Sequence, residues 1–513
     1  MFKGVSFSFP TLLTCAYVLL GLFILYWCFW ISYTRYLHPL AKYPGPFLAS
    51  VSRSWLVMQV AGASADKTQR KLHSRLGPVV RIAPNEVAIS DPGAIRTIYS
   101  VNSGFTKTDF YLPWRPLWAK YPDHFTSLDE RLHASRRRIV NSLYSMTNIA
   151  RAESGIDLCT DLLMSRMREY ADTGEVVDIS SWVQMYAFDV IGQLFFSRMF
   201  GFLKEGGDHR GYIRSLDTLL PILAVTSAMP TYIRTLFLLA GTMFGSVRGA
   251  LTALNEIERA AESCIAERQQ ILKNGETVER KDILSTLFDI IQEKGDKVDF
   301  GLTEAKVEVY VALFAGSDTT AAAISSILYH LVKNPQAYRK LTEEIRQAAA
   351  SGELSVPHVR HSEAVKLPYL EACCKEGMRI HPSVGLTLSR NVPKGGGMIC
   401  GEWFPEGTRV GVNAAVVHRD KTIFGDDANE FRPERWFRDN SKNMDRYMFQ
   451  FGGGSRTCIG KNISLCEMYK MIPQLLLSFD LEDACTEWNT SNYWFNKPSN
   501  VNIIVKHRSG FMK

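Results

Sequence analysis

An uncharged stretch near the N-terminus restricts the fold of this chain more than any other feature. No charged residue occurs between Lys3 and Arg35, and residues 11–31 are dominated by Leu, Phe, Tyr, Trp, Val and Ile. As a helix these 21 residues extend roughly 31 Å, which is about the thickness of the hydrocarbon core of a bilayer. The stretch therefore predicts a helix that spans a membrane once.

A cleavable signal peptide is the alternative interpretation of this stretch. Its apolar core would be shorter and would end in small residues, whereas residues 26–30 are bulky and mostly aromatic. The basic residues Arg35, His38 and Lys42 follow the span, and only Lys3 and the terminal amine precede it. The positive-inside rule then places the main body in the cytosol. We predict three regions: a membrane anchor at residues 1–35, a stiff Pro-rich connector at residues 36–46 and one large domain at residues 47–513.

The composition of the chain excludes several classes of protein. Hydrophobic residues make up 46% and charged residues 22%, as in an ordinary globular protein. The net charge of +7 is spread along the chain without a Lys/Arg-rich block, so nucleic acid is not an expected partner. None of the ten cysteines forms a Cys-x-x-Cys pair, which excludes a zinc ribbon and a thioredoxin motif. In a chain this long we expect scattered, reduced and mostly buried thiols, with one exception.

Two short segments of the large domain have the character of strands. Residues 79–82 and 86–90 are rich in β-branched and apolar residues and flank a turn at residues 83–85. Most of the remaining sequence has helical periodicity, and we find no tandem repeat. The pattern predicts a mainly α fold with a small β-sheet.

The clearest helix is predicted at residues 304–333. Thr303 can cap its N-terminus, and Asn334-Pro335 ends it. Thirty residues give a length of about 45 Å, enough to cross the whole domain. A shorter helix is predicted at residues 368–380, and the Pro-, Gly-, Asp- and Asn-rich residues 404–445 predict a long irregular segment.

The strongest chemical signal is the segment Phe451-Gly452-Gly453-Gly454-Ser455-Arg456-Thr457-Cys458-Ile459-Gly460. A thiolate that binds a metal needs nearby backbone N–H groups, as at the start of a helix, to stabilise its charge. The glycines allow the backbone to approach the sulfur and a bound group closely. Arg456 can form a charge-assisted hydrogen bond to an anion. The alternative is a core cysteine beside a glycine turn.

This segment resembles the haem-binding loop of the cytochrome P450 family, because every fixed position of the pattern Phe-x-x-Gly-x-Arg-x-Cys-x-Gly is present. The resemblance implies that Cys458 ligates the haem iron as a thiolate, a ligand that favours O–O cleavage. It also implies that Phe451, Gly452 and Gly460 lie against the haem and that Arg456 binds a haem propionate.

A second segment, Ala315-Gly316-Ser317-Asp318-Thr319-Thr320, lies inside the long predicted helix and resembles the oxygen-activation motif of the same family. A helical Thr can bond to the carbonyl four residues back, here that of Ala315, and Gly316 leaves room for dioxygen and water beside it. Asp318 and Thr319 are about 100° apart around the helix. We therefore assign Thr319 to the oxygen pocket and Asp318 to the solvent side of a proton relay. The alternative is a packing patch of small residues on a core helix.

Three residues farther along form a predicted structural network. Glu376 and Arg379 match the family's Glu-x-x-Arg and share one helix face, so they can pair. The segment Phe431-Arg432-Pro433-Glu434-Arg435-Trp436 resembles the family's downstream Pro-Glu-Arg segment. By this resemblance Arg435 completes a buried Glu-Arg-Arg network behind the haem loop, with a structural role.

Three further residues are assigned to the haem by resemblance alone. The family's propionate-binding helix often carries Trp-x-x-x-Arg; here His133 takes the Trp position, and Arg137 shares its face at i+4. Arg136 and Arg138 should point elsewhere, toward a redox partner. Arg390 resembles a strand arginine that also meets a propionate. An ordinary surface or core role for His133 and Arg390 is the alternative.

The resemblance covers nearly the whole chain and is greatest to fungal biosynthetic members of the family. It implies the cytochrome P450 fold after one transmembrane helix, haem b as the cofactor, and NADPH electrons from a flavoprotein reductase, with a cytochrome b-type protein as a second donor. The implied function is a monooxygenase that inserts one oxygen atom of O2 into a lipophilic small molecule of secondary metabolism. We expect it on the endoplasmic reticulum membrane, as a single-pass protein with a cytosolic catalytic domain.

Two other functions remain open at this point. A haem-thiolate peroxide isomerase would need neither dioxygen nor a reductase, and the Asp318-Thr319 pair argues against it. A non-catalytic haem-binding membrane protein would bind carbon monoxide but convert no substrate. We expect an apolar, aromatic substrate pocket, lined by Phe105, Phe110, Tyr111, Trp114, Val311, Ala315, residues 384–387, Trp494 and Phe495.

Overall fold

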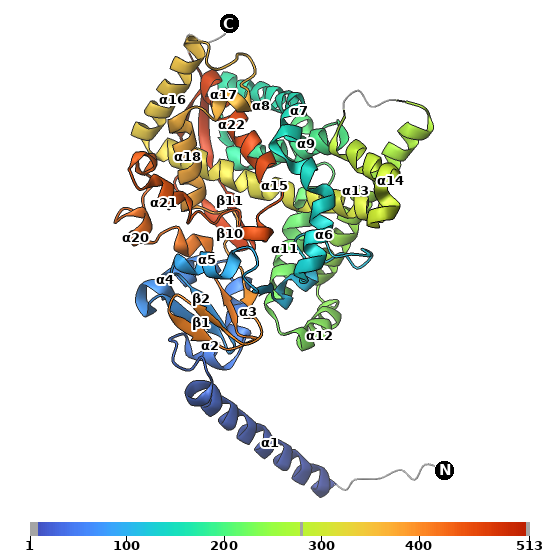
Figure 1. Cartoon of the computed structure of the whole chain (residues 1–513), viewed down its shortest axis with the longest axis vertical. Helices are drawn as coiled ribbons and strands as arrows, with labels where there is room; N and C mark the ends of the chain where they lie inside the picture. The colour runs from blue at the N-terminus through green and yellow to red at the C-terminus, as the bar shows by residue number, and fades with distance from the viewer. Residues whose placement is uncertain (1–8, 277–280, 509–513) are drawn as a thin grey trace.

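A single apolar helix projects from a mainly helical body in the computed structural model, which describes residues 9–276 and 281–508 (Figure 1). This helix, α1 (Phe9–Ser32), belongs to the apolar run Leu13–Leu37, which is long enough to cross a membrane and is 0% buried. An apolar surface of this length without protein cover is stable only in lipid. The predicted membrane-spanning helix is therefore present.

The C-terminal end of the apolar run is fixed to the body. A π-helical turn, η1 (Tyr33–Leu37), continues α1, and Thr34 within it is fully buried. The Trp30 indole donates to the carbonyl of Val51 at 2.8 Å, and the Arg81 guanidinium donates to the carbonyl of Thr34 at 2.7 Å. These two hydrogen bonds hold the end of α1 and the turn η1 against the body.

A five-stranded sheet lies beside the point where α1 enters the body. Its order is β1-β2-β8-β5-β3, and β1 (Val79–Ala83) pairs antiparallel with β2 (Glu86–Ile89), as the two strand-like segments predict. The other members are β8 (Arg409–Gly411), β5 (Arg390–Asn391) and β3 (Thr106–Lys107). The register pairs Lys107 with Arg390. Two cationic side chains from distant parts of the sequence therefore lie on neighbouring strands.

The long helix α15 (Leu302–Lys333) crosses the interior of the body (Figure 1). It is apolar and long enough to span a membrane, yet 72% of its apolar window is buried in protein, so it is a core helix. Its end at Lys333 agrees with the prediction, but its N-cap is Gly301 and not Thr303. The Glu304 carboxylate accepts from the Gly301 N–H at 2.8 Å, which satisfies the helix start without the Thr303 hydroxyl.

Helices α18 (Pro368–Ile380) and α22 (Lys461–Ser478) flank the region that holds the cysteine. The bounds of α18 agree with the prediction. Residues 404–445 are more ordered than a long irregular segment, because short elements follow one another there. These are β8, α19 (Ala414–Val417), α20 (Lys421–Phe424), the 3-10 helix η4 (Pro433–Phe437) and α21 (Ser441–Asp445).

The other helices enclose α15, with α9 (Ile179–Phe196), α13 (Gly245–Lys273) and α14 (Ile283–Val298) packed against it and α11 (Tyr212–Ala228) packed on α13. Further elements include α2 (Phe47–Val51), α3 (Ser54–Ala61), α4 (Ala65–Leu76), α5 (Gly93–Tyr99), η2 (Asp109–Trp114), α6 (Glu130–Val140), η3 (Asn141–Tyr144), α8 (Glu153–Thr173), α12 (Thr231–Gly241), α16 (Pro335–Ala350) and α17 (His361–Ala364). The remaining strands are β4 (Val176–Asp178), β12 (Asn502–His507) and β9 (Phe479–Asp483) in one sheet, with the pairs β6 (Gly397–Ile399) and β7 (Glu402–Phe404), and β10 (Asn489–Tyr493) and β11 (Phe495–Ser499).

Candidate active site

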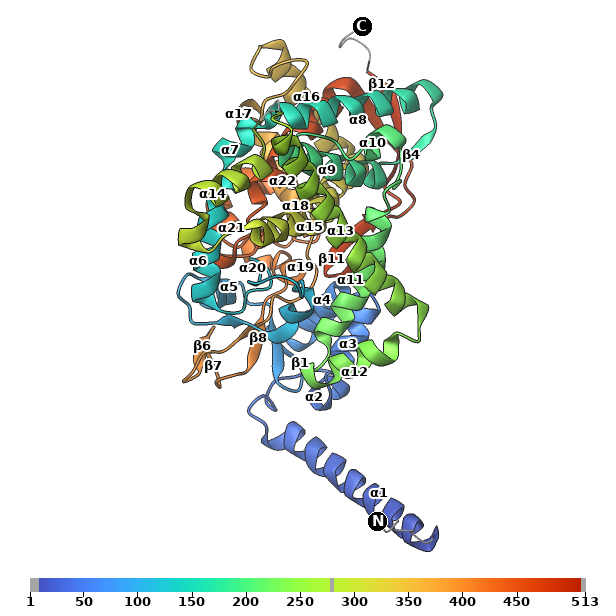
Figure 2. The same cartoon turned by 90° about the vertical axis from the view of Figure 1, so that its right-hand side faces the viewer.

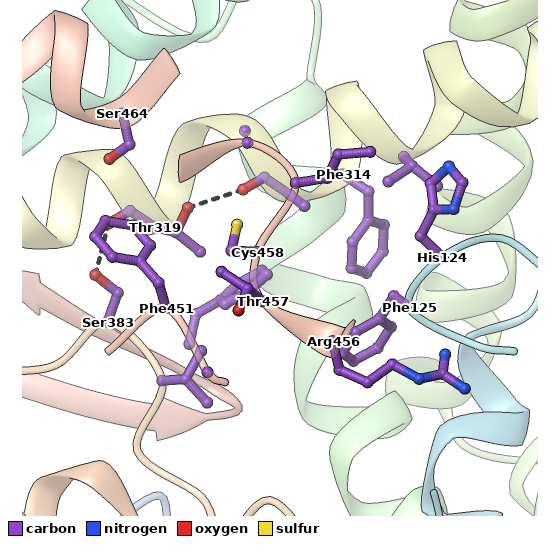
Figure 3. Close-up of a pocket in the computed structure, with 18 of the residues that line it drawn as sticks. His124, Phe125, Phe314, Thr319, Ser383, Phe451, Arg456, Thr457, Cys458 and Ser464 are labelled. Atoms are coloured by element: carbon purple, nitrogen blue, oxygen red, sulfur yellow. Dashed lines mark hydrogen bonds between the residues drawn. The ribbon is translucent and has the colours of Figure 1, made fainter. Parts of the chain in front are cut away.

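One cavity of about 290 Å³ contains most of the residues that the sequence motifs single out. It lies between α15, the cysteine loop (residues 451–460) and the chain that follows β3. Figure 3 shows Cys458 near the middle, with Thr319 on one side and Arg456 and His124 on the other. The two strongest sequence signals, separated by more than a hundred residues, therefore face the same space.

Glycines in the left-handed region shape the cysteine loop. Gly452 and Gly454 have φ of 70° and 57°, and a Cβ on Gly454 would lie 2.0 Å from the carbonyl oxygen of Tyr99. The Cys458 N–H donates to the carbonyl of Phe451 at 2.8 Å and closes the loop. Phe451, Gly452, Cys458 and Gly460 all line the cavity.

Some groups around Cys458 raise the pKa of its thiol and others lower it. Burial raises the pKa of the Cys458 thiol, while the N–H groups of Gly460 and Lys461 and the charge of Arg137 lower it. These N–H groups are free donors because they stand at the start of α22. In the protein without a bound metal, burial has the larger effect, and the pKa of Cys458 is raised. A metal cation on the sulfur would reverse this balance, since a coordinating thiol is deprotonated.

Arg456 is only partly paired. Its Nε and Nη2 bind the Glu130 carboxylate, with an Nη2 to Oε1 distance of 2.8 Å. Its Nη1 is buried and has no partner among the residues that the structure describes. An unpaired guanidinium N–H is costly in the interior, so this nitrogen is available to an anion in the cavity.

His133 and Arg137 on α6 have different surroundings. His133 is buried, and neither ring nitrogen has a partner within residues 9–276 and 281–508. Burial and the charges of Arg456, His124, Arg137 and Lys107 lower its pKa to about 2. Arg137 lines the cavity, and its Nη1 donates to the carbonyl of Thr457 at 2.7 Å. Arg137 thus holds the backbone next to Cys458, because α6 packs directly on the cysteine loop.

Lys107 and Arg390 supply two more cations at this edge of the cavity. The Lys107 ammonium donates to the carbonyl of Phe125 at 2.6 Å and lies 4.2 Å from the centroid of the Tyr111 ring. Burial and the charges of Arg390 and Arg456 lower the pKa of Lys107 well below its usual value. Arg390 donates to the Tyr111 hydroxyl at 3.2 Å. Sequence reasoning missed Lys107, because only the register of β3 on β5 places it here.

These side chains fit a haem. Unpaired or partly paired donors from α6, the cysteine loop, β3 and β5 lie at one edge of the cavity and would bind two carboxylates. Cys458 lies in the same cavity as a soft ligand for iron. In the part of the chain that the structure describes, no three His, Cys, Asp or Glu side chains form a cluster that could hold a bare metal ion. The arrangement matches a metal carried by an organic group with its own ligands.

The segment of α15 above the cavity has a locally altered hydrogen-bond pattern. The Thr319 hydroxyl donates to the carbonyl of Ala315 at 2.9 Å, and the Ser383 hydroxyl donates to the carbonyl of Thr319 at 2.7 Å. Gly316 also lines the cavity and packs closely on α9: a Cβ there would lie 2.6 Å from Cδ1 of Ile191, so that side chain would have to shift. The glycine therefore serves the close approach of two helices, beyond the room for dioxygen that we expected.

Asp318 is buried. Its side chain is only 1% exposed, so a role on the solvent side of a proton relay needs other groups between it and the surface. The Gln184 amide on α9 donates to one carboxylate oxygen, and the other oxygen has no partner among the described residues. Burial raises the pKa of Asp318, while the charge of Lys497 on β11 lowers it. Asp318 is buried because α9 and β11 pack on this face of α15.

The Glu376, Arg379 and Arg435 side chains meet behind the cysteine loop, all 0% exposed. Arg379 binds the Glu376 carboxylate through two nitrogens at 2.9 and 2.8 Å, and Arg435 binds it through Nε at 2.8 Å. Other guanidinium N–H groups donate to backbone carbonyls between residues 418 and 430, and Arg435 Nη1 also binds the Asp427 carboxylate at 2.8 Å. The network therefore fixes the segment that leads into the cysteine loop.

The cavity lining agrees in large part with the expected pocket. Tyr111, Trp114, Val311, Ala315, Val384, Leu386, Trp494 and Phe495 line it. Phe105 and Phe110 do not: Phe105 packs in the core beside the five-stranded sheet, and the ring of Phe110 packs on Trp494 from outside the cavity. Arg136 points away from the cavity, and its guanidinium donates to the carbonyls of Val298 and Asp299.

Comparison with known proteins agrees with the geometry. The cytochrome P450 family profile matches residues 44–503. The chain is 44% identical over 483 residues to "Cytochrome P450 monooxygenase gsfF" of Penicillium aethiopicum, which covers 93% of this chain and 96% of the relative. It is 36% identical to "Cytochrome P450 monooxygenase cicH" of Emericella nidulans (92% and 95% covered) and 34% identical to "Pisatin demethylase" of Fusarium vanettenii (93% and 91% covered).

Proposed function

Because this chain belongs to the cytochrome P450 family and is a haem-thiolate monooxygenase, we propose that it uses electrons from NADPH to insert one oxygen atom of O2 into a lipophilic small molecule of secondary metabolism. The observation that carries the proposal is that Cys458 and Thr319 line one apolar cavity. A ligand for iron and a hydroxyl for proton transfer thus have access to the same bound molecule.

The haem, when bound, supplies the activation of dioxygen at its iron. The chain holds that group through Cys458 on one side and through Lys107, Arg390 and Arg456 at the edge where its carboxylates would lie. Gly452 and Gly460 keep the loop backbone close to the sulfur. The cysteine loop itself is held by Arg137 and, from behind, by the Glu376 network.

Proton transfer is assigned to Thr319 and Asp318. The Thr319 hydroxyl donates to Ala315, so its oxygen can accept a hydrogen bond from water in the cavity and hold that water in place. Asp318 is buried, and its raised pKa favours the protonated form that can donate. Lys497 acts on Asp318 from β11, and its ammonium binds the surface carboxylate of Asp217 at 2.6 Å. We propose that protons reach Asp318 from this side of the protein.

The substrate is proposed to be lipophilic because the cavity offers mainly rings and aliphatic groups. Trp114 and Trp494 lie 5.9 Å apart between ring centroids, and Phe314 packs on Trp114 at 5.8 Å. These rings exclude water and leave few polar groups to orient a hydrophilic molecule. Pisatin demethylase, one relative by name, acts on pisatin; the substrate of this chain is a small molecule whose apolar surface matches these rings.

Electrons are proposed to come from NADPH through a flavoprotein reductase, with a cytochrome b-type protein as a second donor. The cysteine loop supports this, because α6, which packs on it, carries exposed basic residues on its outer face, Arg131 and Arg138 among them. Basic side chains near the ligand loop suit an acidic redox partner.

The apolar N-terminal helix anchors the protein to a membrane, and we propose the endoplasmic reticulum, with the body in the cytosol. A second apolar surface supports a close approach of the body to the bilayer. On and just after α12, five large apolar side chains are 65–84% exposed: Tyr232, Leu236, Leu239, Met243 and Phe244. Figure 2 shows α12 at the same end of the body as α1. Apolar side chains this exposed are stable against lipid.

The test uses the full-length chain in microsomes with a flavoprotein reductase. The ferrous carbon-monoxide complex should absorb near the wavelength that gives the family its name, and Cys458→Ala should lose that band. Candidate lipophilic metabolites are then incubated with NADPH and oxygen-18, and the products are analysed by mass spectrometry. A product that carries one labelled oxygen and requires NADPH supports the proposal. Turnover without NADPH or dioxygen would instead identify a peroxide isomerase.

A further inference from the structure

The end of the membrane helix leaves one buried carbonyl without a donor from the helix itself. In the turn η1, the His38 N–H donates to the carbonyl of Tyr33 at 2.8 Å. The next residue is Pro39, which has no N–H, so the carbonyl of Thr34 lacks the following donor of the helix. Thr34 is 0% exposed, so water does not reach it. A donor from another part of the chain is therefore required.

Arg81 on β1 supplies that donor. Its Nη1 donates to the carbonyl of Thr34 at 2.7 Å, and its Nη2 and Nε donate to the carbonyl of Pro84 at 2.7 and 3.2 Å. The Arg81 side chain is 2% exposed, and burial and the charge of Arg35 lower its pKa to about 10, so it stays charged at neutral pH.

The charge of Arg81 is balanced in an unusual way. No acidic side chain in the described part of the chain forms an ion pair with it, although a buried arginine is normally paired with a carboxylate. Instead, the guanidinium lies against the C-terminal end of α1 and η1, which is the negative end of a helix dipole. The membrane helix itself therefore stabilises the buried cation, and the cation holds the helix.

The connector that follows the turn is also bound to the body. The Arg81 N–H donates to the carbonyl of Pro44 at 2.8 Å, so the connector runs along β1. A Cβ on Gly45 would lie 2.3 Å from the carbonyl oxygen of Arg81, which shows how closely the two segments pack. The Tyr43 ring stacks on that of Phe404 with centroids 5.3 Å apart. The connector is therefore packed against the body along this stretch and is not a free tether.

We propose that α1 and the body form one rigid unit, in which Arg81 fixes the angle between them and thereby the face that the body presents to the lipid surface. A body on a free tether would rest on the membrane in many orientations. Exposed apolar side chains lie on the face that this unit presents. Tyr36 and Leu37 beside the end of α1 are 80% and 73% exposed, and the apolar side chains of α12 lie at the same end of the body (Figure 2). The inference rests on the proposed membrane location and not on the proposed chemistry.

The test measures the distance between α1 and the body in the full-length chain, reconstituted in phosphatidylcholine vesicles. Nitroxide labels are placed on Leu19→Cys in α1 and on Lys71→Cys in α4, two exposed helical positions. Double electron–electron resonance then gives the distribution of distances between the labels. Three exposed native thiols are replaced by Ser so that they do not react with the label: Cys15, Cys28 and Cys400.

The labelled chain with Arg81 intact should give one narrow peak. Arg81→Gln removes the charged donor to Thr34 and the cation that faces the helix dipole, so α1 should separate from the body. Released from these contacts, residues 36–46 would form a connector with an end-to-end spread of roughly 18 Å. The distance distribution of Arg81→Gln should therefore be several times wider than that of the chain with Arg81.

Matched variants separate this role from a general effect of charge. Arg35→Gln removes a cation from the same turn, but Arg35 is exposed and its guanidinium lies over the Phe47 ring, so this variant should keep the narrow peak. Trp30→Phe removes the donor to the Val51 carbonyl without changing β1, and it should also widen the distribution. It keeps the proposal testable if Arg81→Gln folds poorly.

A wide distribution in the chain with Arg81 intact would overturn the proposal. A narrow peak in every one of Arg81→Gln and Trp30→Phe that folds would overturn it as well. The ferrous carbon-monoxide band, recorded on each sample, identifies the folded variants. Its absence from the chain with Arg81 intact would instead refute the proposed function.

Discussion

Removal of the Glu376 carboxylate tests the structural network behind the haem loop. Glu376→Ala deletes an acceptor that receives five hydrogen bonds, two from Arg379 and one each from Arg435, the Arg432 backbone and the Trp436 indole. Both guanidinium groups are fully buried. The variant therefore leaves Arg379 in the interior without its counter-ion, while Arg435 keeps its ion pair with Asp427 at 2.8 Å.

The magnitude follows from this geometry. Breaking a buried ion pair by removing one partner costs about 3–5 kcal/mol, because the remaining charge stays desolvated. Arg379 loses its carboxylate partner and Arg435 keeps Asp427, so a cost within that range applies. A typical native state is stable by roughly 5–15 kcal/mol. Glu376→Ala should therefore yield little folded protein and little bound haem.

The same helix offers a matched control. Glu371 on α18 pairs with Lys375 at 2.8 Å, but both side chains are partly exposed. An exposed pair contributes about 0–1 kcal/mol, so Glu371→Ala should keep near-normal yield. The assay is the haem content per milligram of purified protein, together with the urea concentration at which the carbon-monoxide band is half lost.

Recovery of Glu376→Ala at the yield and urea midpoint of Glu371→Ala would refute the reasoning. It would mean that backbone carbonyls and water replace the carboxylate fully. Arg379→Ala gives a second measurement, since it removes one cation and leaves Glu376 paired with Arg435. Its loss of stability should be smaller than that of Glu376→Ala if desolvated positive charge is the cause.

Three other outcomes are expected. Thr319→Ala should keep haem and substrate binding but divert NADPH electrons into hydrogen peroxide; positioned proton transfer contributes about 10²–10⁴-fold, so product per NADPH should fall, and unchanged coupling would show that Thr319 only packs. Deletion of residues 1–33 should release the body from membranes only in part and leave haem bound, whereas the same deletion with Leu236→Gln and Leu239→Gln should release it fully; flotation on liposomes measures this. Glu467→Gln should raise the urea midpoint at neutral pH. Glu467 is fully buried without a partner among the described residues, and burial raises its pKa well above the usual value. The native state then holds the proton more tightly than the unfolded chain, so stability falls as pH rises above the unfolded pKa, and the amide removes that fall; an equal pH dependence in both proteins would contradict this.

Features that depend on neighbouring residues could be predicted from the sequence. The apolar run that forms α1, the strands β1 and β2, the end of α15 and the bounds of α18 follow from local composition and from helix and strand periodicity. The cysteine loop belongs to the same class. Gly452 and Gly454 adopt the left-handed region within a few residues of Cys458, so the glycines that this loop needs are visible in the local sequence.

Features that depend on packing between distant segments could not be predicted from the sequence. By length and hydropathy both α1 and α15 could span a membrane, and only the elements packed around α15 make it a core helix. One of these elements, the helix α9, buries Asp318 against Gln184. The same helix packs Ile191 closely against Gly316. No local pattern reports which segment will lie across a helix face.

Among the cations at the edge of the cavity, one was found from local sequence and another was placed only by the tertiary structure. Arg456 is found from its place two residues before Cys458, but Lys107 reaches the cavity only through the register of β3 on β5. His124 and Glu308 are separated by 184 positions and meet through a single hydrogen bond. The sequence by itself determined the thiolate ligand, the anchor and the class of reaction, because short-range spacing encodes them. The tertiary structure alone decided which charges surround the cofactor, because charge–charge contacts depend on distances that the fold sets.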